Sequence, residues 1–295
     1  MMLRRKRRPR TWSSTTSATG WGESTFAELA WDRSRGASLR WAVAGLLLGG
    51  AAALVAFAPA AWLARAVASA TAEHVLLADA RGTLWNGSAV AVLTGGADSR
   101  DASALPGRLE WTLGPSGLGL ELGLRHACCL NGTVAVRLTP GLGRLSATLP
   151  PRDGWLGQWP SAWLAGLGTP WNTMQLGGTL RLVSPGLSFE TVQGRARLGG
   201  RADVEMIGVS SRLTTLETLG SYRLSISGDE TGASQLQLST QEGALQLSGD
   251  GTWGPGGLRF RGEARAAGPA DEPALTNLLN IIGRRSGARS VISIG

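Results

Sequence analysis

Few side chains in this sequence could carry out catalysis or bind a metal. The two histidines, His74 and His126, do not belong to an HExxH pair, and neither is matched by a second ligand at metal-binding spacing. The single lysine, Lys6, lies near the N-terminus, which excludes a GxxxxGK phosphate-binding loop and a Schiff-base lysine elsewhere. The GxSxG elbow of many hydrolases is also absent. We therefore expect no enzyme activity, no catalytic residues, no metal and no cofactor.

The two cysteines, Cys128 and Cys129, are adjacent. In an oxidising compartment they could form a disulfide, but its eight-membered ring strains the peptide bond between them. On a β-strand the two side chains would point to opposite faces of the sheet. The sequence favours this second arrangement, with two unpaired thiols.

The feature that organises the chain is an uncharged apolar run over residues 41–64. Its 24 residues exceed the roughly 20 that an α-helix needs to cross a bilayer core. Trp41 and Trp62 stand near its ends, about 31 Å apart on a continuous helix at 1.5 Å per residue. Indole rings at both ends are typical of the aromatic belts at the two membrane surfaces. We predict a transmembrane helix over 41–64.

Charge predicts the direction of this helix. Residues 1–40 contain nine Arg or Lys and three acidic residues, whereas Arg65 and Arg81 are the only basic residues in the first 20 positions beyond the run. Basic flanks stay in the cytoplasm, so residues 71–295 should be periplasmic. We interpret residues 1–40 as a basic, disordered cytoplasmic tail that attracts anionic lipid and binds no nucleic acid. A cleaved signal peptide is the alternative, but 40 residues before the apolar run are too many for one.

From Thr71 onward, short segments alternate apolar and polar residues, as in Leu236–Ser239 and Leu245–Ser248. This period of two predicts strands with one buried face, and Asn86-Gly87 and Asn131-Gly132 predict hairpin turns between them. The fold class is therefore mainly β: a long, curved, half-pipe-like antiparallel sheet.

Two segments have helical features. Residues 159–168 begin near a proline and end at a glycine, and Trp155, Trp159 and Trp163 recur every four residues. Residues 273–283 place leucines and an isoleucine at helical spacing, followed by Arg284 and Arg285. We expect one or two short helices that cap an end of the sheet, and a last strand over 290–294.

One further segment, Ala80–Ala89 (ARGTLWNGSA), carries a more specific signal. Shortly after the apolar run, it resembles the Gly-Thr-Leu/Val-Trp-x-Gly-x-Ala signature of protein N of the type II (general) secretion pathway. Residues 249–264 and 275–285 are also similar to the end of that family, so that the resemblance covers 41–295. It implies an accessory inner-membrane component that supports export of folded proteins across the outer membrane, with other secretion proteins as partners and no catalytic residues.

Within this segment we expect a structural motif formed by Gly82, Thr83, Leu84, Trp85 and Gly87. The Trp85 ring should pack inside the sheet, and Gly82 should permit a bulge or a close approach of strands. A second resemblance points elsewhere. Long antiparallel half-pipes behind one anchor are also similar to AsmA-like proteins proposed to carry lipids, which would need an apolar trough open at both ends. Fold alone does not decide between these two functions.

Overall fold

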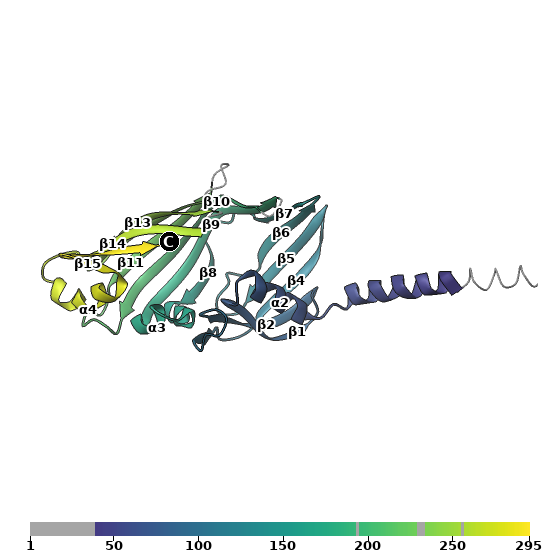
Figure 1. The fold of residues 1–295 in the computed structure, drawn as a ribbon, viewed down its shortest axis with the longest axis horizontal. Coiled ribbons are helices and arrows are strands. Elements are labelled where there is room, and N and C mark those ends of the chain that lie inside the picture. The colour runs from purple at the N-terminus through teal and green to yellow at the C-terminus, as the bar shows by residue number, and fades with distance from the viewer. Residues whose placement is uncertain (1–38, 193–194, 229–233, 255–256) are drawn as a thin grey trace, which may run out of the picture. The chain divides into compact units, whose positions relative to one another are not determined.

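The structure, a computed structural model, describes residues 39–192, 195–228, 234–254 and 257–295 (Figure 1). Its first helix, Leu39–Ala56, is the one described helix long and apolar enough to cross a membrane, with a mean hydropathy of 1.8. Most of the predicted tail lies outside the described residues. The described residues up to Phe57 belong to one unit, and those from Ala58 to Gly295 belong to a second.

The structure differs from one continuous helix over 41–64. The first helix stops at Ala56, Pro59 is extended, and a second helix, α2 (Ala60–Ala70), begins directly after it. Proline lacks a backbone N–H and disfavours helical geometry in the residue before it, which explains the break. Trp41 lies on the first helix and Trp62 on α2, so the spacing expected on one uninterrupted helix does not apply.

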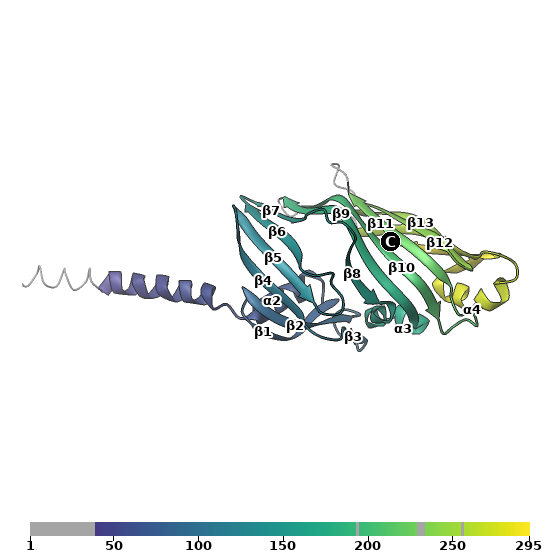
Figure 2. The ribbon, with the colours of Figure 1, turned by 180° about the vertical axis from the view of Figure 1, so that it is seen from behind.

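The second unit is built on one antiparallel sheet of 16 strands, with β1 and β15 at its two ends (Figures 1 and 2). Because these two end strands do not pair with each other, the sheet is open, as predicted. Most strands that are neighbours in the sheet are also neighbours in the sequence. Two short strands lie off this path: β3 pairs with β2, and β8 pairs with β9. The strands are β1 (Val75–Gly82), β2 (Asn86–Thr94), β3 (Ala102–Ala104), β4 (Leu109–Ser116), β5 (Gly119–His126), β6 (Val134–Gly141), β7 (Arg144–Leu149), β8 (Trp155–Pro160), β9 (Leu176–Val192), β10 (Arg195–Ser211), β11 (Gly220–Gly228), β12 (Ser234–Glu242), β13 (Leu245–Gly254), β14 (Gly257–Ala266), β15 (Arg284–Ser286) and β16 (Arg289–Ile294).

Strand register gives the sheet one apolar and one polar face. A row across the sheet from Val204 on β10 continues through the directly paired residues Leu224, Leu238, Gly249, Gly262 and Ile292. The adjacent row from Glu205 runs through Arg223, Ser239, Ser248 and Glu263. Successive side chains of a strand point to opposite faces, so the alternation seen in the sequence places every second residue on a polar face.

Helix α4 (Glu272–Ile282) covers one part of the apolar face. Its Leu275, Leu278 and Leu279 are fully buried against sheet residues that include Tyr222 and Leu245. The helical spacing of the leucines places them on one side of the helix, as predicted. Arg284 and Arg285, expected at the helix C-terminus, instead form β15, because the chain becomes extended at Gly283.

The other predicted helix is a 3-10 helix, η1 (Ser161–Leu167), between Pro160 and Gly168. The four-residue tryptophan spacing does not belong to one helix, because Trp155 and Trp159 lie on β8. Trp159 and Trp163 nevertheless stack, with ring centroids 6.4 Å apart. A one-turn helix, α3 (Trp171–Met174), follows.

Candidate functional site

The predicted motif forms a loop that joins three parts of the chain. Residues 83–85 connect β1 to β2, and Gly82 pairs with Gly87 across the loop. The Thr83 N–H donates to the Asn86 carbonyl at 2.8 Å and closes the loop. The Leu84 N–H donates to the Ala58 carbonyl at 2.7 Å, and the Trp85 carbonyl accepts from the Leu113 N–H at 2.7 Å. The loop thus ties the segment before α2 to β4.

The expected Asn-Gly turn is placed differently. Asn86 and Gly87 already belong to β2, and the turn is formed by the residues before them. Gly82 has φ +88°, and a Cβ there would lie 2.5 Å from the Asn86 carbonyl oxygen. The positive φ therefore falls on Gly82, where glycine is the residue that adopts it without strain.

The buried ring beside this loop is Trp111, not Trp85. Trp85 is only partly buried, whereas Trp111 on β4 is 1% exposed. The Trp111 ring packs with Ala60 and Ala89, and its Nε1–H donates to the Leu84 carbonyl at 3.1 Å. A Cβ at Gly87 would lie 2.5 Å from the Trp111 ring. Glycine at 87 is thus required by the tryptophan on the next strand.

Sequence reasoning missed Trp111 because its buried partners are 22 to 51 positions away, counting from Ala89 and from Ala60. The sequence did contain a signal for the burial of Trp111. Trp111 alternates with Glu110 and Thr112, so a strand with one apolar face would bury it.

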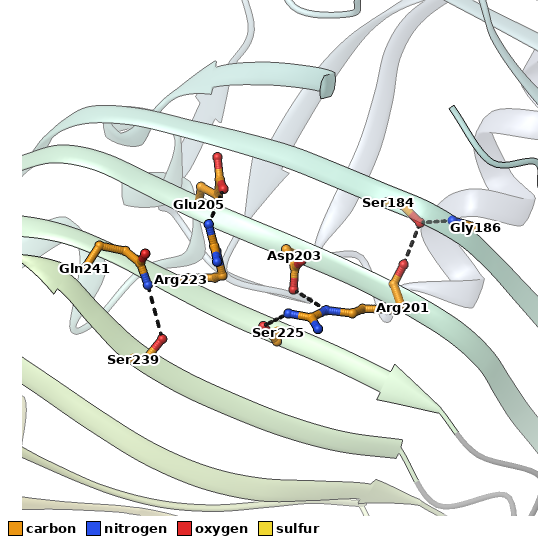
Figure 3. A network of polar contacts seen from close by, with 9 residues as sticks. All are labelled: Ser184, Gly186, Arg201, Asp203, Glu205, Arg223, Ser225, Ser239 and Gln241. Carbon is orange, nitrogen blue, oxygen red and sulfur yellow. Dashed lines mark hydrogen bonds and ion pairs between the residues drawn. The ribbon is translucent and has the colours of Figure 1, made fainter. Parts of the chain in front are cut away.

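The polar face of the sheet is a candidate interaction surface. On β10 and β11, Arg201 Nε donates to Asp203 Oδ1 at 3.0 Å and its terminal nitrogen donates to Ser225 Oγ at 3.2 Å (Figure 3). Arg223 donates to Glu205 Oε1 at 2.9 Å. Figure 3 shows these side chains standing on neighbouring strands with Ser239 and Gln241 beyond them. The ion pairs are half-exposed, so each contributes at most about 1 kcal/mol to stability.

Two open depressions lie on this face. One, of about 620 Å³, spans β12–β14 and β16 and is lined by polar groups that include Ser248, Asp250, Arg261, Glu263 and Arg289. The other, of about 500 Å³, lies beside the loop and includes Arg81, Glu110 and Arg125. Both are shallow and carry charges of both signs, which suits contact with another polar surface better than enclosure of a small molecule.

A charged cluster supports the loop from the polar side. Arg108 donates to Asp79 Oδ2 at 2.8 Å and to Ser88 Oγ at 3.0 Å. Hydrogen bonds from Arg108 and then Arg81 lower the pKa of Asp79 below its ordinary value. Arg108 therefore joins β1 to β2 at the place where the register of the two strands shifts.

The cysteines do not follow the favoured prediction. Cys128 and Cys129 form a disulfide, in a turn between β5 and β6 instead of on a strand. A turn is not bound by the alternation that separates neighbouring side chains on a strand. The prediction that His126 has no potential ligand near it is wrong as well, since His126 Nδ1 lies 3.3 Å from Cys128 Sγ.

Packing on the apolar face bears on the lipid-carrier alternative. The α4 leucines cover it at β11–β14, and α2 with Trp111 covers it at β2 and β4. A lipid conduit needs a trough that is open at both ends, whereas helices pack on this face in both regions. Among the described residues we find no support for the AsmA-like alternative.

An open, sixteen-stranded antiparallel sheet preceded by one apolar helix long enough to span a bilayer fits a single-pass membrane protein. The family comparison is more specific. Residues 73–292 match the family of type II secretion system (T2SS) protein N, and the chain belongs to this family. It is a family of non-catalytic components of the secretion apparatus, which agrees with the resemblance seen around the GTLWNG loop. No curated protein and no solved structure matches the chain.

Proposed function

We propose that this protein is an accessory inner-membrane component of the type II secretion system that supports export of folded proteins through protein–protein contacts. The match of residues 73–292 to the protein N family carries this proposal. The apolar helix before the matched region supports attachment to a membrane. The protein acts without catalysis or cofactor, and its partners are other secretion proteins of the inner membrane and periplasm.

The proposed topology has the N-terminus in the cytoplasm and the sheet in the periplasm. In the sequence, Arg33 and Arg35 precede the apolar helix and Arg40 is its second residue, and basic residues near the end of a span are retained on the cytoplasmic side. Trp41 and Trp62 are proposed to lie at the membrane surfaces, where they contact lipid. A periplasm-specific reporter fused after Gly295 should be active, and an inactive fusion with normal expression would contradict this orientation.

The proposed role of the GTLWNG loop is to hold the start of the sheet domain to the segment that leaves the membrane. The Leu84 N–H donates a hydrogen bond to the carbonyl of Ala58, which directly precedes Pro59 and α2. Pro59 also forms an isolated antiparallel β-bridge with Thr83. A secretion component that acts through contacts needs a sheet domain whose first residues are held in place. Within the unit that starts at Ala58, this loop provides that constraint.

We assign partner contacts to the polar face because the sheet edges are poorly suited to them. At one edge β15 has only three residues, two of them arginines. At the other edge, β1 is irregular between Ala78 and Arg81. Short, charged or bulged edges resist pairing with another strand. The polar face instead offers partly exposed charges of both signs over β9–β11.

Charge reversal tests this assignment. The double variant Arg201→Glu/Arg223→Glu should lower secretion of type II substrates while leaving the protein folded, because both guanidinium groups are on the proposed contact face. The matched control, Arg100→Glu/Arg212→Glu, makes the same change in net charge at two exposed loop positions. Equal secretion by both variants, at equal protein levels, would contradict the assignment of partner contacts to the polar face.

A further inference from the structure

Beside the apolar packing of β8 and η1 lies a cluster of three groups that the secretion role does not use: His126, Cys128 and Cys129. One ligand atom from each lies within 4.8 Å of the others. His126 is 5% exposed and Cys129 is 2% exposed, while Cys128 is open to solvent. The cluster therefore has a buried floor and a single accessible side.

The His126 ring is poorly satisfied while the disulfide is closed. Its Nδ1 faces Cys128 Sγ at 3.3 Å, and its buried Nε2 has no hydrogen-bond partner among the described residues. A disulfide sulfur carries no proton and is a weak acceptor. Whichever ring nitrogen carries the hydrogen, a buried imidazole nitrogen is left without a strong partner, which is uncommon in a folded protein.

The spacing suits a metal ion between these groups. With a Zn–N distance of about 2.0 Å and a Zn–S distance of about 2.3 Å, a tetrahedral ion separates the two ligand atoms by about 3.5 Å. The observed 3.3 Å between Nδ1 and the Cys128 sulfur is within a few tenths of an ångström of this value. Thiolate and imidazole are the ligands preferred by soft and borderline cations with a filled d shell.

The backbone holds the cluster in place without the disulfide. The His126 carbonyl accepts hydrogen bonds from the N–H groups of Cys129 and Leu130, both at 3.3 Å. The Cys129 carbonyl accepts from the Gln158 N–H at 2.8 Å, which fixes the turn against β8. Opening the sulfur–sulfur bond therefore leaves the three side chains on a fixed turn.

We propose that the reduced form of this turn binds one Zn²⁺-like cation through His126 Nδ1 and the two thiolates, with a fourth position open to solvent beside Cys128. The disulfide is the closed, metal-free form. A dithiol donor opens it by two exchanges. One donor thiolate attacks the exposed Cys128 sulfur and Cys129 leaves as a thiolate. The second donor thiolate then releases Cys128, and the donor ends as a disulfide. The cation binds the two cysteines as thiolates, so any proton that remains on either thiol is released when the metal binds.

Zinc binding to the full chain in detergent tests the site, with Zn²⁺ itself as the probe. After reduction with a phosphine, which is converted to its oxide, competition with a chromophoric chelator should show one Zn²⁺ bound per chain. The oxidised chain should bind none at the same concentration. Equal binding by the two forms, or no binding by the reduced form, would overturn the proposal.

Two further measurements make the result independent of folding defects. His126→Gln should weaken zinc binding by more than about 10-fold, since loss of a ligand exceeds the effect of losing a supporting residue. His74→Gln, at the exposed second histidine, is the matched control and should bind as wild type. In the unmodified reduced chain, Co²⁺ should produce thiolate-to-metal charge-transfer absorption. Its absence, or wild-type affinity in His126→Gln, would contradict the assigned ligands.

Discussion

Truncation of Trp111 to alanine is the sharpest test of how the start of the sheet is held together. The ring is 1% exposed, contacts Ala60 on α2, and donates a hydrogen bond to the Leu84 carbonyl. Removal of a buried tryptophan costs about 3–5 kcal/mol, through lost burial and the cavity that remains. The hydrogen bond adds to this cost, because the Leu84 carbonyl loses its indole donor.

The assay is urea unfolding of the purified full chain, followed by far-ultraviolet circular dichroism. Trp253→Ala is the matched control, since it removes the same side chain where 41% of it is exposed, and it should cost about 1 kcal/mol or less. Trp111→Phe should fall between the two variants, because it keeps most of the ring but loses the N–H donor. A Trp111→Ala variant within about 1 kcal/mol of wild type would refute the assignment of this ring to the core.

Three further predictions concern single positions. Gly87→Ala should destabilise the fold by about 1–3 kcal/mol, since its Cβ would meet the Trp111 ring at 2.5 Å, whereas Gly114→Ala has open space and should be close to neutral in the same unfolding assay. Trp85→Ala should cost less than about 3 kcal/mol because the ring is only partly buried, and a larger loss would restore the ring to the core. Burial raises the pKa of Tyr222 well above its ordinary value. The stability that this shift contributes is fully present below about pH 10, where tyrosine is protonated in both states, and is lost as pH rises further and the unfolded state ionises. Because Tyr222 is the only tyrosine, tyrosinate absorbance should appear together with unfolding, and its appearance in the folded chain would contradict the burial.

The alternation of residues was enough to predict the type of fold. Apolar and polar residues alternate at every position, as in Leu236 and Gln237. This period of two predicts a strand with one buried and one exposed face. The helix α4 and its apolar side could also be predicted, because the helical spacing of its leucines is a local property of the sequence. Both predictions depend on residues that are close together in the sequence.

The errors have a different physical origin. The strand formed by Arg284 and Arg285 and the burial of Trp111 in place of Trp85 depend on partners in other elements, whereas the break at Pro59 is a local effect of proline that the length of the apolar run concealed. The turn at Cys128 is a local feature that the expectation of a strand through both cysteines missed, and it places Cys128 Sγ 3.3 Å from His126 Nδ1. Beside the GTLWNG loop the fully buried ring is Trp111, whereas Trp85, which was expected to pack inside the sheet, is partly buried.

The central claim is that this chain supports type II secretion from the membrane through its sheet domain. The most direct measurement is the fraction of a folded type II substrate that reaches the medium from cells lacking the protein. We expect this fraction to fall in those cells and to be restored by the wild-type chain, but not by Arg201→Glu/Arg223→Glu. Unchanged export in the cells that lack the protein would contradict the account.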